Sequence, residues 1–243
     1  NEGLVRGRCF GQTLTGAFDY VALPLAFLLV AALYSAVGQA GGTGYIAVMG
    51  LAGYTPDIIK PAALALNILV TAIACSRFER AGLLSWRSFY PFAILGAPFS
   101  ILGGATDLPS TLYHPFVGCL LLVAAVLMLR SAGRAATSDA AAPPTPPFVP
   151  ALFVGAALGF LSGLTGVGGG IYLAPLILTV GWTSTRQASG VAAVFNLLNS
   201  AAALAGAWSK PLAFTAAMPW WLIAVGIGGL CGSWAGVRHL PAQ

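Results

Sequence analysis

The sequence contains very little charge. Asp, Glu, Lys and Arg make up 7% of its 243 residues, against roughly 25% in an average soluble domain. Eleven basic and six acidic side chains are too few to cover a soluble protein of this size with a charged surface. Hydrophobic residues make up 58% of the chain, and its mean hydropathy is +0.87. The composition therefore excludes a water-soluble globular domain and indicates a surface that is largely covered by lipid.

Residue types that build metal, disulfide or catalytic centres are also scarce. The four cysteines have no close spacing and the two histidines are isolated; these residues are Cys9, Cys75, Cys119, Cys231, His114 and His239. The pattern predicts no metal site, no disulfide framework and no cofactor. An intramembrane enzyme would need a nucleophile and a base, and although Ser162 lies beside Gly163, neither histidine is placed to serve it. We therefore expect a protein that is not an enzyme.

Long apolar runs are what the sequence does have. A helix needs about 20 apolar residues to cross a bilayer, and seven runs approach that length: 21–41, 57–76, 89–105, 112–130, 149–166, 187–208 and 212–235. A glycine cluster follows the first and the fifth run, and each cluster precedes a short apolar stretch, Tyr45 to Gly53 and Ile171 to Gly181. These stretches are too short to span alone and predict broken or re-entrant helices. The sequence thus predicts an all-α polytopic membrane protein with about seven transmembrane helices.

Basic residues are scattered singly between the apolar runs. The net charge is +5, but no basic stripe is present, so nucleic acid is not favoured as a partner. If the amino terminus is cytoplasmic and each run crosses once, eight basic residues lie inside: Arg6, Arg8, Arg77, Arg80, Arg87, Arg130, Arg134 and Lys210. Lys60, Arg186 and Arg238 then lie outside. This distribution follows the positive-inside rule and favours a multi-pass protein of the cell membrane.

A proline-rich segment divides the chain in two. Residues 131–150 contain five prolines among small residues, Pro143, Pro144, Pro146, Pro147 and Pro150, a composition typical of an extended linker. We therefore expect a first transmembrane repeat at 1–130, a linker at 131–150 and a second repeat at 151–243, truncated at its carboxyl end.

The two halves carry a common pattern. Gly38-Gln39-Ala40-Gly41-Gly42 aligns with Gly166-Val167-Gly168-Gly169-Gly170, and Gly53 aligns with Gly181. One inserted residue later, Lys60, Asn67 and Thr71 align with Ser189, Asn196 and Ser200. Four crossings would separate these copies, which leaves the halves in the same orientation, whereas an odd number would invert them. In either arrangement, the two glycine motifs are expected to meet near the centre.

The glycine motifs are candidate anion sites. Glycines at membrane depth are tolerated where the backbone lines a cavity, and an interrupted helix exposes free N–H groups and a positive dipole end. Amide and hydroxyl side chains on one helix face could add donors. The candidate substrate-binding residues are Gly41, Gly42, Asn67, Gly166, Gly168, Gly169, Gly170, Asn196 and Ser200. The alternative is structural: glycines that let helices pack closely, and polar side chains, Asn199 and Thr71 among them, that join helices.

Charged residues fall at the ends of the apolar runs. We expect Asp57, Asp107, Lys60 and Arg186 to be solvated or to reach the interface. No run has a carboxylate clearly at its centre, so no proton-relay residue is predicted there. An anion carrier of this kind would be driven largely by the membrane potential.

The second half resembles the sulfite exporter TauE/SafE family of membrane transporters. The resemblance is closest over Gly166 to Gly170, over Leu173-Ala174-Pro175-Leu176 and through Leu198-Asn199-Ser200-Ala201, and the first half is similar more loosely. It implies export or uptake of small anions such as sulfite, sulfonates or other organic acids. It also implies seven or eight helices, and an eighth after Gly236 would make the halves equal.

Two functions are consistent with these features. The first is an exporter of small anions in the bacterial inner membrane, working by alternating access with the anion bound at the glycine-rich helix ends. The second is a passive anion channel, which would not saturate or show counter-transport. Apart from the anion and the lipid bilayer, the sequence indicates no partner.

Overall fold

The computed structural model describes residues 18–36, 39–82, 84–135, 146–208 and 214–239 of the chain. These ranges are almost entirely helical and contain no β-strand. The elements are the π-helical turn η1 (Phe18–Ala22), α2 (Leu23–Ala36), α3 (Gly42–Leu51), α4 (Pro56–Arg80), α5 (Trp86–Ala105), α6 (Ser110–Ala135), α7 (Phe148–Thr165), α8 (Gly170–Thr179), α9 (Thr185–Ala207) and α10 (Met218–His239). The predicted all-helical membrane fold is confirmed.

Six helices in the described ranges are long and apolar enough to cross a membrane: α4, α5, α6, α7, α9 and α10. They correspond to six of the seven predicted runs. The first run, 21–41, is different, because its α-helix α2 ends at Ala36 after 14 residues. The expected eighth helix stays a prediction, since the described part ends with α10.

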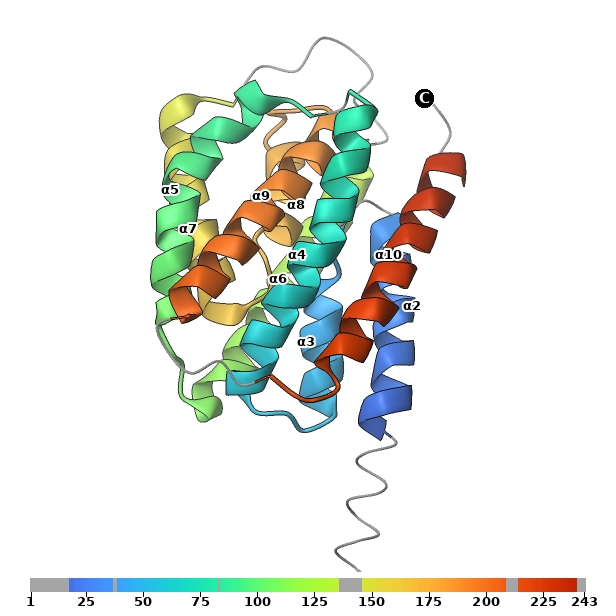
Figure 1. Cartoon of the computed structure of the whole chain (residues 1–243). Helices are drawn as coiled ribbons and strands as arrows, with labels where there is room; N and C mark the ends of the chain where they lie inside the picture. Colours follow the sequence, from blue (N-terminus) through green and yellow to red (C-terminus); the bar gives the residue numbers. More distant parts are fainter. Residues whose placement is uncertain (1–17, 37–38, 83, 136–145, 209–213, 240–243) are drawn as a thin grey trace, which may run out of the picture.

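Both predicted helix interruptions are present, and each forms a hairpin that turns back. The chain climbs through α2 and returns through the short α3 to the end where α2 began (Figure 1). From the other end, α7 descends and α8 returns (Figure 1). The helices α4, α5, α6, α9 and α10 run from one end of the bundle to the other.

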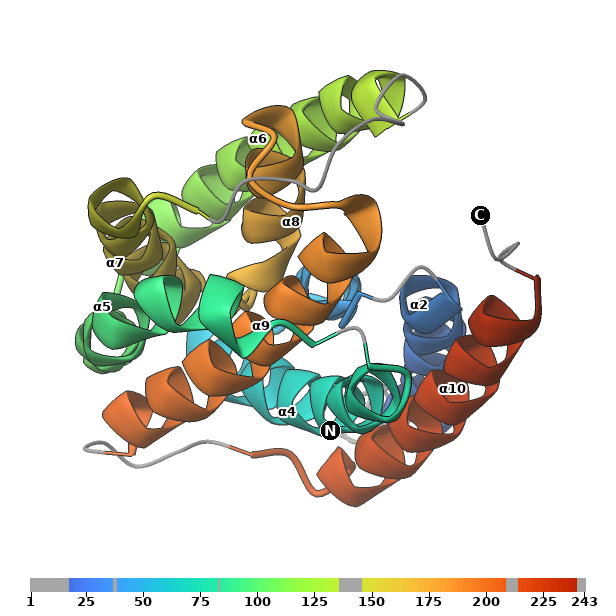
Figure 2. The same cartoon turned by 90° about the horizontal axis from the view of Figure 1, so that it is seen from above.

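Glycine allows two pairs of helices to pack with their backbones in contact. Figure 2 shows α5 beside α7 on one side and α2 beside α10 on the other. A Cβ atom on Gly159 would overlap the carbonyl oxygen of Gly96, and one on Gly232 would overlap that of Ala32. Only glycine lets two helix backbones come this close. Small residues at the contact are common where helices associate in lipid.

The helices α4 and α9 cross between these pairs (Figure 2). They run in opposite directions, since Lys60 near the start of α4 and Ala207 at the end of α9 line the same cavity. Asn67 and Asn196, each near the middle of its helix, both adjoin Gly168. The antiparallel pair therefore brings the equivalent asparagines of the two halves to the centre.

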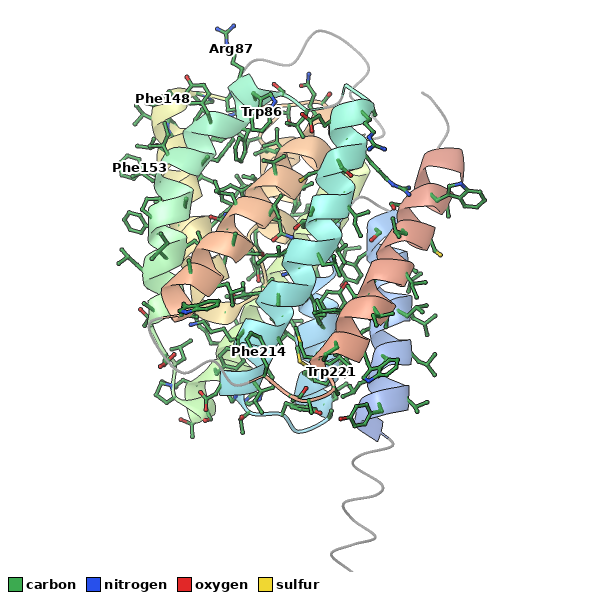
Figure 3. All side chains as sticks on the ribbon, viewed as in Figure 1. Trp86, Arg87, Phe148, Phe153, Phe214 and Trp221 are labelled. Atoms are coloured by element: carbon green, nitrogen blue, oxygen red, sulfur yellow. The ribbon has the colours of Figure 1, made fainter. Side chains whose placement is uncertain are left out.

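Arginine gathers at one end of the bundle. Arg87 and Trp86 lie at the upper end in Figure 3, where α4 ends and α5 begins. The expected placement of Arg186 and Arg238 on the opposite face is wrong, because the hairpins do not cross and α9 therefore starts, and α10 ends, at this same end. Lys60 lies near the other end. The positive-inside rule assigns the arginine end to the cytoplasm.

The same correction applies to the amino-terminal half. The helix α2 begins at the end opposite to the arginines rather than at the arginine end, and the amino terminus itself lies outside the described residues. Arg6, Arg8 and Lys210 lie outside the described residues. The predicted linker is shorter than 131–150, since α6 continues to Ala135 and α7 begins at Phe148.

Aromatic side chains join the helices at the non-arginine end. Trp221 of α10 is fully buried and meets the rings of Phe27 and Tyr54 edge to face, with centroid distances of 5.2 and 5.7 Å. These contacts tie α10 to α2 and to the segment that connects α3 with α4. Phe153, in contrast, points away from the bundle and is 67% exposed, as a lipid-facing residue would be (Figure 3).

The glycine contact between α5 and α7 gives a stability prediction. Gly159→Val places a side chain against the Gly96 backbone and should cost at least about 1–3 kcal/mol, because the helices must separate. Gly118→Val in α6 is the control, since nothing lies within 4 Å of its Cβ position. Thermal unfolding in detergent, followed by the loss of the monodisperse peak, should show a lower midpoint for Gly159→Val alone. Equal midpoints would contradict the packing.

Candidate functional site

The site is built on a tight turn between α7 and α8. The helix α7 ends at Thr165 and is capped by Gly166, whose φ of 80° is in the left-handed region, and Gly168 repeats this conformation with a φ of 79°. Only glycine adopts such angles without strain. The turn reverses the chain and aims the start of α8 at the centre of the bundle.

The starts of α3 and α8 both lack a side-chain cap. Their N-cap residues are Gly41 and Gly169, which have no side chain to accept a hydrogen bond from the first helical turn. The first N–H groups of a helix have no acceptor within that helix, and they form the positive end of its dipole. Each start therefore presents uncapped donors.

These two helix starts meet. A Cβ atom on Gly42, the first residue of α3, would overlap the carbonyl oxygen of Val167 in the α7–α8 turn and the amide of Asn67. A Cβ atom on Gly168 would overlap the side chain of Asn196. The two glycine clusters thus adjoin each other, as the sequence predicts.

A small cavity lies where the clusters meet. It has a volume of about 30 Å³. Its described lining includes backbone from both clusters and two polar side chains of α9, contributed by Gly41, Gly42, Val167, Gly168, Gly170, Ser189 and Asn196. A buried water needs about 10–15 Å³ on this measure. The cavity has room for one or two waters, and a larger anion requires the surrounding helices to move apart.

Buried polar atoms that have no partner among the described residues lie at this cavity or close to the helix starts that form it. The Asn67 amide nitrogen donates to the carbonyl oxygen of Val167 at 2.9 Å, but its oxygen accepts from no described residue. The Asn196 oxygen and both amide atoms of Asn199 also have no partner among the described residues, and these side chains are 4% and 0% exposed. Buried polar groups are normally paired. These orphaned atoms indicate a place for water or a polar ligand.

The structure distributes the nine predicted residues over three positions. Those lining the cavity are Gly41, Gly42, Gly168, Gly170 and Asn196. Asn67 does not line the cavity itself but lies against Gly42 and Gly168, which do. The remaining three do not line it: Gly166 packs on Lys60, Gly169 packs on Phe195, and Ser200 is buried with its hydroxyl unpaired within the described ranges.

Sequence reasoning gave too little weight to two residues. Asn199 was expected to join helices, yet neither of its amide atoms has a partner in the described part of the chain, and it lies near Gly169. Its three-residue spacing from Asn196 places both on one helix face, which is the signal that could have identified it. Ser189, a repeat position that is absent from the predicted site residues, lines the cavity.

Lys60 differs most from the sequence expectation. Instead of being solvated, it is only 7% exposed. Its ammonium group donates to the backbone carbonyl oxygens of Gly103 at 3.2 Å, Gly104 at 2.8 Å and Thr106 at 2.7 Å. These carbonyls form the carboxyl end of α5, where a cation is favoured. Asp57 and Asp107 are exposed, as expected.

A second, larger cavity lies at the non-arginine end. Its volume is about 260 Å³, and its described lining contains the charged residues Asp57, Lys60 and Asp107 together with Tyr113, Leu164 and Ala207. Since the two carboxylates are exposed and Lys60 is buried, the cavity extends from the surface inward to Lys60. Among the described residues, no group of three or more His, Cys, Asp or Glu side chains could hold a metal ion.

An all-helical bundle with helices broken at two glycine turns around a buried polar centre defines a polytopic membrane protein of the transporter class. The chain belongs to the sulfite exporter TauE/SafE family, whose family model matches residues 23–242. It is also similar to a probable membrane transporter protein, y4hK, of Sinorhizobium fredii (strain NBRC 101917 / NGR234). The two are 50% identical over 225 residues, which cover 93% of this chain and 91% of that protein. No solved structure is matched.

The orphaned amides give a second stability prediction. Asn199→Leu should keep or raise the unfolding midpoint in the absence of ligand, because it removes buried polar atoms that have no described partner. Asn67→Leu, the matched variant, should lower it, because the Val167 carbonyl loses its donor, at a cost of about 1–3 kcal/mol. Thermal unfolding of both variants in one detergent tests the difference. A larger loss for Asn199→Leu would mean that this amide has a structural role.

Proposed function

We propose that this chain exports small anions, such as sulfite, sulfonates or other organic acids, by alternating access. The anion binds between the starts of α3 and α8, at Gly41, Gly42, Gly168 and Gly170, with the amides of Asn67 and Asn196 as further donors. The observation that carries the proposal is the meeting of two uncapped helix starts at a cavity with unpaired buried amides.

The chemistry of this site suits transient binding of an anion. The described residues that line the cavity include no Lys or Arg, so attraction depends on helix dipoles and neutral donors. Each helix start contributes roughly 0.3–2 kcal/mol. A site of this strength attracts an anion yet releases it, which a carrier requires.

The separation of the two cavities favours a carrier over a channel. Ser189, near the start of α9, lines the central cavity, and Ala207, at its end, lines the second cavity. The central cavity therefore lies nearer the end where α9 begins, the second cavity lies where α9 ends, and Lys60 of the second cavity packs against Gly166 of the α7–α8 turn. A passive channel, the alternative function, needs a continuous path, whereas a carrier opens each side in turn.

An inverted repeat supplies a route to alternating access. The helices α3 and α8 both begin with glycine and both have 10 residues, and α4 and α9 are antiparallel. Three helices that each run from one end of the bundle to the other, α4, α5 and α6, separate the α2–α3 hairpin from the α7–α8 hairpin (Figure 1), and an odd number inverts the second hairpin. We therefore treat 1–130 and 151–243 as inverted repeats, with α6 extending past the first repeat to Ala135 and α7 beginning at Phe148, just before the second. If each repeat adopts the conformation of the other, the anion site closes to one side of the membrane and opens to the other.

Substitution of Gly42 tests the site. Gly42→Ala puts a methyl group into the space beside Val167 and Asn67 and should reduce sulfite flux in proteoliposomes by at least tenfold. Gly50→Ala in the same helix is the matched control, because nothing lies within 4 Å of its Cβ position, and it should transport normally. Both proteins must elute as monodisperse peaks. Normal flux through a folded Gly42→Ala protein would show that the glycine is a packing residue.

The driving force gives a further prediction. A potential of about 100 mV, negative inside, makes export of a monovalent anion downhill by about 2.3 kcal/mol. We expect efflux from proteoliposomes to follow a potential set with potassium and valinomycin. Efflux that ignores the potential but follows a pH gradient would overturn this expectation and direct attention to Asp57 and Asp107. Flux that saturates and shows counter-transport identifies a carrier, whereas flux without either identifies a channel.

A further inference from the structure

The central site contains hydrogen-bond acceptors as well as donors. The uncapped starts of α3 and α8 offer backbone N–H groups. The side-chain oxygen of Asn196, a residue that lines the cavity, is buried and accepts from no described residue. The Asn67 oxygen is likewise buried and unpaired within the described ranges, and it lies 2.8 Å from the position that a Cβ atom on Gly42 would take. The site therefore combines N–H groups that need an acceptor with two oxygens that need a donor.

The orientation of the Asn67 amide is fixed by its neighbour. Its nitrogen donates to the carbonyl oxygen of Val167 at 2.9 Å. Exchanging the nitrogen and oxygen of this amide would set two acceptors against each other, so the usual ambiguity of an asparagine does not arise here. For Asn196, either orientation leaves one oxygen, and an amide oxygen only accepts. Both asparagines thus bring an acceptor to the site.

A fully deprotonated anion cannot satisfy these two oxygens. Its own oxygens are acceptors, which pair with the N–H groups of the helix starts and are repelled by the amide oxygens. A buried acceptor that is left without a donor weakens binding. A ligand that carries both an acid group and a hydroxyl satisfies both kinds of group at once. Because the cavity has a volume of only about 30 Å³, the hydroxyl must lie close to the acid group.

We propose that the site selects small anions that carry a hydroxyl beside their acid group, such as hydroxysulfonates or hydroxycarboxylates. This inference rests on the proposed function and narrows its substrate class. The acid group binds between the starts of α3 and α8, and the hydroxyl donates to the Asn196 oxygen, with the Asn67 oxygen as the second acceptor. An analogue without the O–H is rejected because it leaves buried acceptors unpaired.

Paired anions of equal size test the proposal in the unsubstituted chain. Hydroxymethanesulfonate and ethanesulfonate have the same charge and differ by a hydroxyl in place of a methyl group, and glycolate and propionate form the corresponding carboxylate pair. Flux into proteoliposomes, after subtraction of protein-free liposomes, should favour the hydroxyl-bearing member of at least one pair by about tenfold. The pair that shows the preference identifies the acid group. Equal flux within both pairs would overturn the inference, because water then satisfies the oxygens.

Substitution of Asn196 tests the acceptor. Asn196→Leu keeps the approximate size and removes the amide, so the roughly tenfold preference should fall toward one. Gly50→Ala, the control used above, should keep it. The readout is a ratio, which a purely structural defect leaves unchanged because it lowers both fluxes alike. A folded Asn196→Leu protein that keeps the preference would overturn the assignment.

Failure of the proposed function has a different appearance. If the chain does not transport small anions, neither member of either pair is carried by the unsubstituted protein. If it transports them without regard to the hydroxyl, all four anions are carried and only the inference fails. The comparison in the unsubstituted chain decides between these outcomes even where Asn196→Leu does not fold.

Discussion

Contact between helix backbones is the constraint on which the rest of this structure depends. Helices in lipid are not driven together by hydrophobic burial, so close packing must hold them. Glycine supplies it here: Gly159 brings α7 onto α5, and Gly232 brings α10 onto α2. With these two pairs in place at the flanks, α4 and α9 cross between them (Figure 2). The same lack of side chains lets Gly42 reach the α7–α8 turn.

The close contact between helices also encloses polar groups in the interior, where a membrane protein usually has few. Unpaired amides are costly in a low-dielectric interior, yet the oxygen of Asn196 and both amide atoms of Asn199 have no partner among the described residues, and the two side chains lie beside Gly168 and Gly169 at the start of α8. Their retention fits a site that is completed only when a ligand binds. Lys60 shows the contrasting solution, in which a buried charge is paired with carbonyls at a helix end.

Much of the fold and part of the site could be predicted from local features. Six of the seven apolar runs match long helices, because length and hydrophobicity are properties of each run by itself. Gly42, Gly168 and Asn196 could be chosen because glycine clusters and aligned asparagines are visible in the sequence. Lys60 could not be placed correctly, since a lysine near a helix end looks solvated until the end of α5 is known to cover it.

By itself, the sequence determined the membrane environment, the helices and the two points at which helices break, since each depends on composition within a short window. Tertiary structure decided the direction in which the chain leaves each break. A run of apolar residues followed by glycine reads the same whether the helix crosses or turns back, and the packing of α3 on α4 and of α8 on α9 selects the hairpins. That choice reversed the expected sidedness of Arg186 and Arg238, inverted the proposed repeat, and placed Lys60 in the second cavity beside the α7–α8 turn.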